Sequence, residues 1–424
     1  KVVLPKPLAE NLIRALRGQK LKAFKPQKRF LSLVSTGDKY AVASRGNWAL
    51  SGKWVWRWKN YIDQTFMRSL NEFGLIEANK HQTGDVSSMR CGGCGAKVGQ
   101  PILERVLKQI ASAHLASFSP TAQMSLSGPD DAAVFSVPQN KLLVQSVDAF
   151  RCFIDDDYLF GQIAANHALG DIFAMGAAPH SAQAIVTLPF ASEEKVEQQL
   201  LHLMLGASKV FESANMPIIG GHTAEGRELS LGFAVNGLVE ENKILTKGGL
   251  QAGDVLILTK SLGTGALFAA DMRGQAKGIW VKSAIDTMLV SNQKASEVLF
   301  AHGVKACTDV TGFGLAGHLL EMLQPSMCRA SLDLNSLPLL DGVIELMQKG
   351  FFSSLHEQNK QIEQKMTAYI DVDSENSSLL KDILFDPQTA GGLLAGVPAK
   401  FAEHCLQELK ALGYHDACVI GEII

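Results

Sequence analysis

The sequence predicts an α+β protein in which two layered units follow a small basic module. The chain has 424 residues, more than one ordinary domain holds. From residue 99 onward, helical and strand patterns alternate. Several neighbouring strands are joined by links of hairpin length, which favours α+β layers over a purely parallel sheet. Hydrophobic residues make up 46% and charged residues 19%, as in a globular protein with real cores.

Residues 1–75 form the basic module. Its first 59 residues carry a net charge of +12, and they contain four of the five tryptophans. Leucines that repeat every four residues predict a helix over 7–17. Two strands, 30–35 and 39–44, flank a hairpin signal, and an aromatic helix follows over 53–70. Because the remainder of the chain carries −14, this shift in composition marks a module boundary.

Residues 76–98 are expected to be a flexible linker and loop, rich in glycine, serine and small side chains. Cys91, Cys94 and Lys97 lie at its end. The CxxC pair can be half of a zinc site, although no second pair with zinc-like spacing follows. It can also have no role, or hold a reactive thiol whose thiolate Lys97 favours. The chain's seven cysteines are mostly isolated, so we expect a reducing cytoplasm and no disulfide framework.

Two larger units are predicted over 99–250 and 251–424. In the first unit the patterns predict helices at 102–110, 157–175 and 192–210, and strands at 132–137, 141–147, 182–188 and 229–239. Ser192, followed by two glutamates, is the expected N-cap of the third helix. The second unit is expected to begin with a strand over 255–259, a helix through 283–301 and a strand near Ala306.

Aspartates lie where these strands end or begin. Asp131 opens a strand, Asp148 closes one and Asp309 follows one, whereas Asp171 lies inside a helix. Mg²⁺ prefers carboxylate oxygens and shares them with substrate phosphates. An aspartate at a strand end is also an ordinary turn former or cap. Asp171 is different, because its apolar neighbours make an unpaired carboxylate costly to bury.

Glycine-rich turns are candidates for phosphate cradles made of backbone N–H groups. The segments are Gly220-Gly221-His222-Thr223, Gly263-Thr264-Gly265, Gly312-Phe313-Gly314 and Gly391-Gly392. Glycine is also the default turn residue. None of these segments has the spacing of a P-loop or of the GxGxxG dinucleotide fingerprint, so P-loop and Rossmann proteins are disfavoured.

Five motifs occur in the order in which selenophosphate synthetases carry them, and residues 89–424 therefore resemble that family. The motifs are Cys94-Gly95-Ala96-Lys97, Asp130-Asp131-Ala132-Ala133-Val134, Asp171-Ile172-Phe173-Ala174-Met175-Gly176, Thr308-Asp309-Val310-Thr311-Gly312-Phe313-Gly314 and Asp386-Pro387-Gln388-Thr389-Ala390-Gly391-Gly392. The resemblance implies that ATP, selenide and water are converted into selenophosphate, AMP and phosphate. It also implies a fold like that of aminoimidazole ribonucleotide synthetase, with two α+β units and a homodimer that shares a barrel.

The resemblance also implies roles for single residues. Cys94 matches the position that is cysteine or selenocysteine in the family, and Lys97 matches a lysine expected at the phosphates. The carboxylates expected to hold Mg²⁺ are Asp131, Asp148, Asp171 and Asp309, with Asp148 also beside the nucleotide. The segment that resembles a turn by the nucleotide is Gly220-Gly221-His222-Thr223. We therefore expect Mg²⁺, ATP, selenide and a second copy as partners, and no nucleic acid.

The sequence departs from the family at two positions. Ala96 stands where some members have a second cysteine, and His167 stands where a nucleotide-contacting asparagine is expected. His167 and Asp171 are four residues apart on one helix face and can simply pair. Two other functions stay open. One is a sibling enzyme of the same fold that acts on another acceptor, which Cys94 with Lys97 argues against. The other is a non-catalytic regulatory homologue, which the intact aspartates argue against.

The basic module is similar to the C-terminal end of NADH-dehydrogenase-like flavoproteins, which in some organisms precede a selenophosphate synthetase. The similarity lies in Ser35-Thr36-Gly37-Asp38-Lys39-Tyr40-Ala41-Val42-Ala43 and Gly52-Lys53-Trp54-Val55-Trp56-Arg57-Trp58-Lys59. Only this tail is present, so we expect a piece of a fusion protein that binds neither FAD nor NAD. Its aromatic helix is expected to pack with solvated charges, with weak peripheral membrane contact as the alternative.

Overall fold

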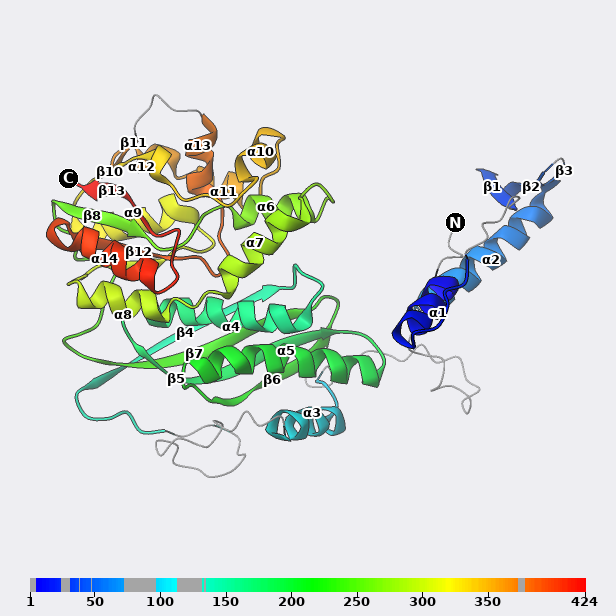
Figure 1. Ribbon diagram of the computed structural model, residues 1–424, viewed down its shortest axis with the longest axis horizontal. Helices are drawn as coiled ribbons and strands as arrows, with labels where there is room; N and C mark the ends of the chain where they lie inside the picture. The colour runs from blue at the N-terminus through cyan, green and yellow to red at the C-terminus, as the bar shows by residue number, and fades with distance from the viewer. Residues whose placement is uncertain are drawn as a thin grey trace. The chain divides into compact units, whose positions relative to one another are not determined.

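The computed structural model describes residues 5–23, 31–37, 39–46, 48–71, 97–112, 132, 135–372 and 378–424. The chain divides into two compact units, Lys1–Asp85 and Val86–Ile424, each drawn in Figure 1. The predictions made for Cys91, Cys94 and Asp131 lie outside the described residues. Within the described part of the chain, no helix combines the length and the apolar character needed to cross a bilayer.

The first unit is a three-stranded antiparallel sheet with a helix packed on it. The elements are α1 (Pro5–Leu16), β1 (Ser32–Gly37), β2 (Tyr40–Arg45), β3 (Trp48–Gly52) and α2 (Lys53–Asn71). Ala41, Ala43 and Val55 form its small buried cluster. The predicted helices and hairpin are confirmed. The sequence pattern missed β3, because four of its five side chains are exposed and show no alternation.

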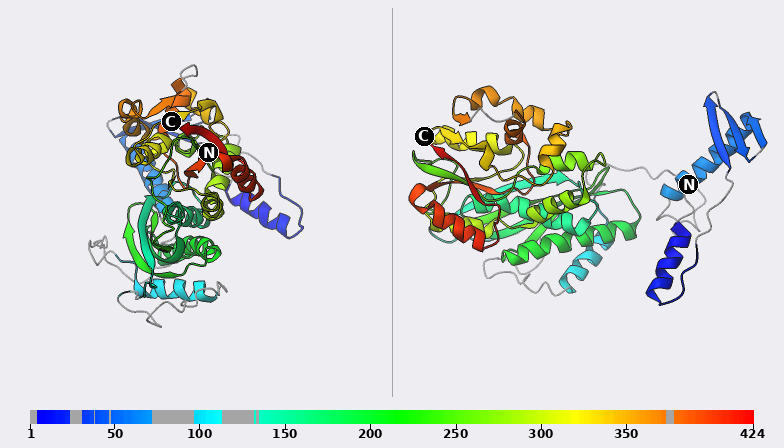
Figure 2. Two further views of the ribbon diagram at one scale, coloured as in Figure 1. Left: turned by 90° about the vertical axis from the view of Figure 1, so that its left-hand side faces the viewer. Right: turned by 45° about the horizontal axis from the view of Figure 1, so that its top comes forward.

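The first half of the second unit is a four-stranded mixed sheet covered on one face by helices. The strand order is β4 (Lys141–Arg151), β7 (Ser230–Glu240), β5 (Ala178–Pro189) and β6 (Ile218–Gly226), with only the β5–β6 pair parallel. Figure 2 shows α4 (Asp157–Ala174) and α5 (Glu193–Ser213) on one side of these strands. α3 (Gln100–Ser112) packs against α5, where Arg105 pairs with Glu197 at 2.6 Å.

Helix α4 is the element that joins the two halves of the second unit. Its first turn is capped by Asp156, whose side chain accepts the backbone N–H of Leu159. Thirteen of its residues are buried and they cover every side of the helix, which is typical of a helix enclosed in a core. One side packs on the sheet and on α5, and the opposite side packs on the second half.

The second half is built on a six-stranded sheet with helices around it (Figure 1). The strand order is β11 (Ile370–Val372), β10 (Ala330–Leu332), β13 (Cys418–Ile423), β8 (Asp254–Leu258), β12 (Leu393–Pro398) and β9 (Cys307–Asp309). The longer helices are α6 (Thr264–Asp271), α7 (Gly278–Leu289), α8 (Gln293–Ala301), α9 (Gly314–Ser326) and α14 (Ala399–Ala411). Shorter ones are α10 (Val343–Gln348), α11 (His356–Lys360), α12 (Glu363–Met366) and α13 (Ser378–Asp382).

Several predicted boundaries were wrong. The helix expected through 283–301 is two helices, because Val290 is extended and interrupts it between α7 and α8. The strand expected to close at Asp148 continues to Arg151, since β4 pairs with β7 along its whole length. Ser192 occupies the N-cap of α5, but its hydroxyl makes no capping hydrogen bond. Of the described residues in 132–137, none lies in a strand longer than a single bridge position.

The segment Gly220-Gly221-His222-Thr223 is also not a turn. It lies within β6, in parallel register with β5, where Gly221 pairs with Ala184. A Cβ atom at Gly221 would lie 2.4 Å from the carbonyl oxygen of Ala184, so glycine is required for the two strands to approach. Gly221 therefore serves strand packing, and a turn-like phosphate cradle is not formed there.

A carboxylate cluster at the junction of the two halves

Three aspartates from three different elements meet where the two halves of the second unit join. Asp148 lies on β4, Asp171 on the last turns of α4, and Asp309 at the end of β9. Side chains alternate along β4, so Ser146 and Asp148 face α4 while Val147 faces the opposite side. The hydroxyl of Ser146 donates to Asp171 Oδ2 at 2.5 Å, which holds the middle carboxylate in place.

These carboxylates repel one another, and the repulsion raises the pKa values of Asp148 and Asp309. The pKa of Asp148 is raised to about 6, chiefly by burial and in addition by the negative charge of Asp171 and a hydrogen-bonding contact with it. Burial, followed by the charges of Asp171 and Asp148, raises the pKa of Asp309 well above its ordinary value. Carboxylates in such contact repel unless a cation or a proton lies between them. A set of carboxylate oxygens without nitrogen or sulfur fits Mg²⁺.

Gly170 allows Asp309 to reach this cluster. A Cβ atom at Gly170 would lie only 2.4 Å from Asp309 Oδ2, well inside van der Waals contact. The carboxylate of the second half therefore lies directly against the backbone of α4, beside Asp171. Glycine is a poor helix former in mid-helix, and at this position its missing side chain makes room for the site.

His167 lies one helical turn before Asp171 and is held as a neutral imidazole. Its Nδ1 accepts the backbone N–H of Ala390 at 3.0 Å, so the proton is on Nε2, which lies 3.9 Å from Asp148 Oδ1. The pKa of His167 is lowered to about 4, chiefly by burial; the charge of Asp171 opposes this shift and the charge of Lys260 adds to it. The carboxylate that the His167 ring faces most closely is Asp148, so the expected alternative of simple pairing with Asp171 is not what the structure shows.

Lys260 belongs to the site and was missed from the sequence. It follows β8, is buried, and donates from Nζ to the carbonyl oxygens of Val290 at 2.6 Å and Ala390 at 3.0 Å. Burial lowers its pKa to about 7, an effect that the nearby charge of Asp309 opposes. The one sequence feature that could have indicated Lys260 is its position directly after an apolar strand. Many surface lysines share that position.

The segment 386–392 positions the site without forming a phosphate cradle. Ala390 holds His167 through its N–H and Lys260 through its carbonyl. Gln388 Oε1 accepts the backbone N–H groups of Gly263 and Thr264 at 2.9 and 3.1 Å, and Asp386 Oδ2 accepts that of Gly265 at 3.1 Å. These donors are therefore occupied by side chains, which corrects the expectation that the Gly263-Thr264-Gly265 turn offers them to a phosphate.

Lys97 and β6 lie apart from the carboxylates. Lys97 is exposed and forms a bridge with Ala224, and the next residue, Val98, donates its N–H to Thr223 at 3.4 Å. β6 is one edge of the four-stranded sheet and β4 is the other, three strand spacings or roughly 14 Å away. A single chain therefore groups Asp148, His167, Asp171 and Asp309, but not Lys97, Gly220, Gly221, His222 and Thr223 with them.

Comparisons with known proteins identify the family of each half. A model described as AIR synthase related protein, N-terminal domain, matches residues 129–239, and its C-terminal counterpart matches residues 251–424. A selenide, water dikinase of Myxococcus xanthus (strain DK1622) is 40% identical over 336 residues, which cover 78% of this chain and 92% of that protein. One of Clostridioides difficile (strain 630) is 34% identical over 338 residues, which cover 78% and 93%.

Solved structures show the same fold at low identity. A thiamine-monophosphate kinase from Stenotrophomonas maltophilia K279a aligns with a TM-score of 0.56 at 20% identity, over 75% of this chain and 92% of its own. The hydrogenase maturation protein HypE in complex with ATP aligns with a TM-score of 0.54 at 17% identity, over 75% and 85%. The predicted two-unit α+β fold is thereby confirmed.

Proposed function

The chain belongs to the selenide, water dikinase family, and from this membership we propose that its second unit converts ATP, selenide and water into selenophosphate, AMP and phosphate. The observation that carries the proposal is the cluster of Asp148, Asp171 and Asp309, drawn from both halves of the unit. A phosphoryl-transfer enzyme needs positioning and charge stabilisation, and such a cluster supports both.

We propose that Asp148, Asp171 and Asp309 hold Mg²⁺, together with Asp131. When bound, Mg²⁺ neutralises the charge of the ATP phosphates and of the group being transferred. His167 offers a fixed Nε2–H donor beside Asp148, where a nucleotide oxygen can accept it. Lys260 holds Ala390, and in its protonated form it attracts Asp309, which helps to keep that carboxylate in place.

Cys94 and Lys97 are proposed to serve the reacting groups. Selenide is itself a strong nucleophile, so it needs delivery without water or oxygen rather than a general base. Cys94 would present selenium, and Lys97 would contact the phosphates. The position of Lys97 beside Thr223 supports a role for β6 in the same site.

A homodimer is supported by the open face of the four-stranded sheet. Val147 and Leu143 on β4 and Ile185 on β5 face away from the helices and are 60%, 40% and 37% exposed. An apolar face of this kind on a regular sheet is typical of a contact surface between chains. We propose that a second copy covers it. β4 and β6 are opposite edges of the sheet in one chain, and both edges would then lie at the interface.

We propose that the first unit is related to the C-terminal end of flavoprotein oxidoreductases and does not itself bind a flavin. Its described core is limited to Ala41, Ala43 and Val55 with partly buried neighbours, which is too small to enclose a flavin ring. Trp54 and Tyr61 on α2 are 54% and 68% exposed. In a basic unit these aromatics support weak peripheral contact with an anionic membrane surface.

The test is AMP formation from ATP in the absence of oxygen, with and without selenide. We expect AMP to form only with selenide and Mg²⁺, Cys94→Ser to abolish it, and Cys91→Ser to retain most of it. Transfer to another acceptor without AMP would indicate a sibling enzyme, and no ATP turnover would indicate a regulatory homologue. Equal loss in both cysteine variants would instead indicate that the CxxC pair acts as a unit.

A further inference from the structure

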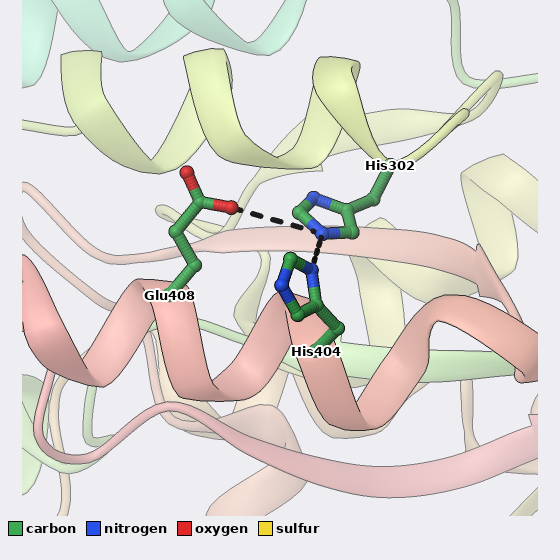
Figure 3. A group of neighbouring side chains, drawn as sticks. All are labelled: His302, His404 and Glu408. Atoms are coloured by element: carbon green, nitrogen blue, oxygen red, sulfur yellow. Dashed lines mark hydrogen bonds and ion pairs between the residues drawn. The ribbon is translucent and has the colours of Figure 1, made fainter.

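A second group of potential metal ligands lies between α8 and α14, away from the carboxylate cluster. Figure 3 shows His302, just after α8, facing His404 and Glu408 of α14. His302 Nε2 lies 2.8 Å from His404 Nδ1 and 3.7 Å from Glu408 Oε2. One donor atom from each of the three residues lies within 4.8 Å of the others.

The orientation of His302 is fixed by a backbone carbonyl. Its Nδ1 lies 2.9 Å from the carbonyl oxygen of Val298, one turn earlier, and a carbonyl can only accept a hydrogen bond. The proton of His302 is therefore on Nδ1, and the lone pair of Nε2 points toward His404 and Glu408. A histidine that binds a metal usually has its second nitrogen held in this way.

The group combines one buried histidine with two exposed residues. The His302 side chain is 8% exposed, whereas the Glu408 side chain is 44% exposed and His404 lies at the surface. His404 and Glu408 are four residues apart on α14, so they present their donor atoms on one helix face. An ion can thus enter from solvent and meet a preset, buried nitrogen at the base of the site.

We propose that His302, His404 and Glu408 form a site for a zinc-type divalent transition metal. With metal–nitrogen bonds of about 2.0–2.1 Å, a tetrahedral angle places two ligand nitrogens about 3.3–3.4 Å apart. The observed separation between His302 Nε2 and His404 Nδ1, 2.8 Å, is shorter. Moving Nδ1 of the exposed His404 by about half an ångström would bring the separation to this value. Three protein ligands leave a fourth position for water.

Ligand chemistry separates this site from the carboxylate cluster. Imidazole nitrogens favour Zn²⁺, whereas a set of carboxylate oxygens suits Mg²⁺. A bound ion would link α8 to α14. α8 in turn contacts α4, where the Ser296 hydroxyl donates to the carbonyl oxygen of Phe173 at 2.6 Å. The expected effect is on the stability of this half, and the inference does not depend on the proposed reaction.

The test uses the full chain carrying Cys91→Ser and Cys94→Ser, so that these thiols do not compete, in excess Mg²⁺. Zn²⁺ affinity is measured by competition with a chromophoric chelator, and metal-free Tm confirms that each variant is folded. We expect one Zn²⁺ per chain, at least about tenfold weaker binding in His404→Ala and Glu408→Gln, and unchanged binding in His415→Ala, an exposed histidine elsewhere.

Cobalt provides an independent readout of the ligands. Co²⁺ bound at this site in the same Cys91→Ser, Cys94→Ser chain should give the visible bands of a four-coordinate nitrogen and oxygen site, and adding His404→Ala should remove them. Equal Zn²⁺ affinity in His404→Ala and His415→Ala would overturn the proposal. The His302–His404 contact would then be a hydrogen bond between two imidazoles and no metal site.

Discussion

Asp309 is a buried carboxylate placed against two others, and its replacement separates stability from activity. Asp309→Asn keeps the volume and removes one negative charge from the cluster. Without divalent metal we expect the free energy of unfolding to rise by about 1 kcal/mol, because the remaining carboxylates are repelled less. Turnover should fall roughly 10²-fold or more, since a ligand that supports charge in the transition state is lost. Urea unfolding in EDTA and anaerobic AMP formation measure the two effects.

Asp341→Asn is the matched control for this variant. Asp341 is exposed and lies in the same half of the unit, away from the cluster. It should change neither stability nor turnover. Wild-type turnover in Asp309→Asn at ordinary magnesium would remove Asp309 from the metal site.

Asp386 makes the stability of the second half depend on pH. Burial raises its pKa to about 7, although Gln388 and the backbone N–H of Gly265 donate to it and lower the pKa. The folded chain thus keeps a proton that the unfolded chain loses near pH 4. Between about pH 4 and 7 this group makes stability fall as pH rises, and the loss is complete above pH 7.

Asp386→Asn should abolish that dependence while its side-chain oxygen still accepts hydrogen bonds. Relative to wild type, the variant should therefore gain stability between pH 4 and 7, by an amount on the order of a few kcal/mol, and then level off. Urea unfolding at pH 5 and pH 8 measures the difference. A stability difference that is the same at both pH values would show that Asp386 is ionised in the folded chain.

At the scale of the element, α4 combines a structural and a functional requirement at Gly170. Gly170→Ala favours the helix by about 0.5–1 kcal/mol through propensity, but its Cβ would meet Asp309 Oδ2 at 2.4 Å. We expect Asp309 to be displaced, so that the magnesium concentration for half-maximal turnover rises and turnover falls. A titration of AMP formation with Mg²⁺ measures this.

Gly278→Ala is the control for the helix effect, because a Cβ at Gly278 in α7 meets nothing within 4 Å. That variant should be as active as wild type and no less stable. Unchanged magnesium dependence in Gly170→Ala would contradict the close approach of Asp309 to α4.

The elements that could be predicted from the sequence are those whose hydrophobic pattern arises within the element. The patterns of residues 157–175 and 229–239 predict α4 and β7 to within one residue, whereas the pattern of 182–188 locates β5 but begins four residues late. The interruption between α7 and α8 was missed although Ser291 and Asn292 stand at it, because polar residues of this kind also occur on the exposed face of a continuous helix. The glycines of β6 led to the prediction of a turn, because the strand is defined by its pairing with β5, which lies far away in the sequence.

The same reasoning explains the site. Asp171 carries a signal because a carboxylate in an apolar context needs a partner, and Asp148 and Asp309 carry one because they lie at predicted strand ends and match the family resemblance. Lys260 has no such signal, as its role arises from the carbonyls of Val290 and Ala390, which only tertiary structure brings to it. Whether Lys97, Cys94 and Asp131 join the site stays a prediction.

At the scale of the whole molecule, the proposed homodimer depends on the open face of the four-stranded sheet. Val147→Glu places a charge at its most exposed apolar position on β4 and should convert the dimer to a monomer, because a carboxylate buried at an interface has no cation to pair with. Sedimentation equilibrium measures the mass.

Met272→Glu, at a 78% exposed apolar position in the other half, is the control and should remain dimeric. A dimer of unchanged affinity in Val147→Glu would exclude this face as the interface.

The central claim is that this chain forms a phosphorus–selenium bond from ATP and selenide. The most direct measurement is ³¹P NMR of an anaerobic reaction with ⁷⁷Se-labelled selenide, ATP and Mg²⁺. We predict a product resonance split by one bonded ⁷⁷Se nucleus, formed in equal amount with AMP and absent without Mg²⁺. ATP turnover that yields ADP, or AMP without any selenium-coupled phosphorus resonance, would contradict the account.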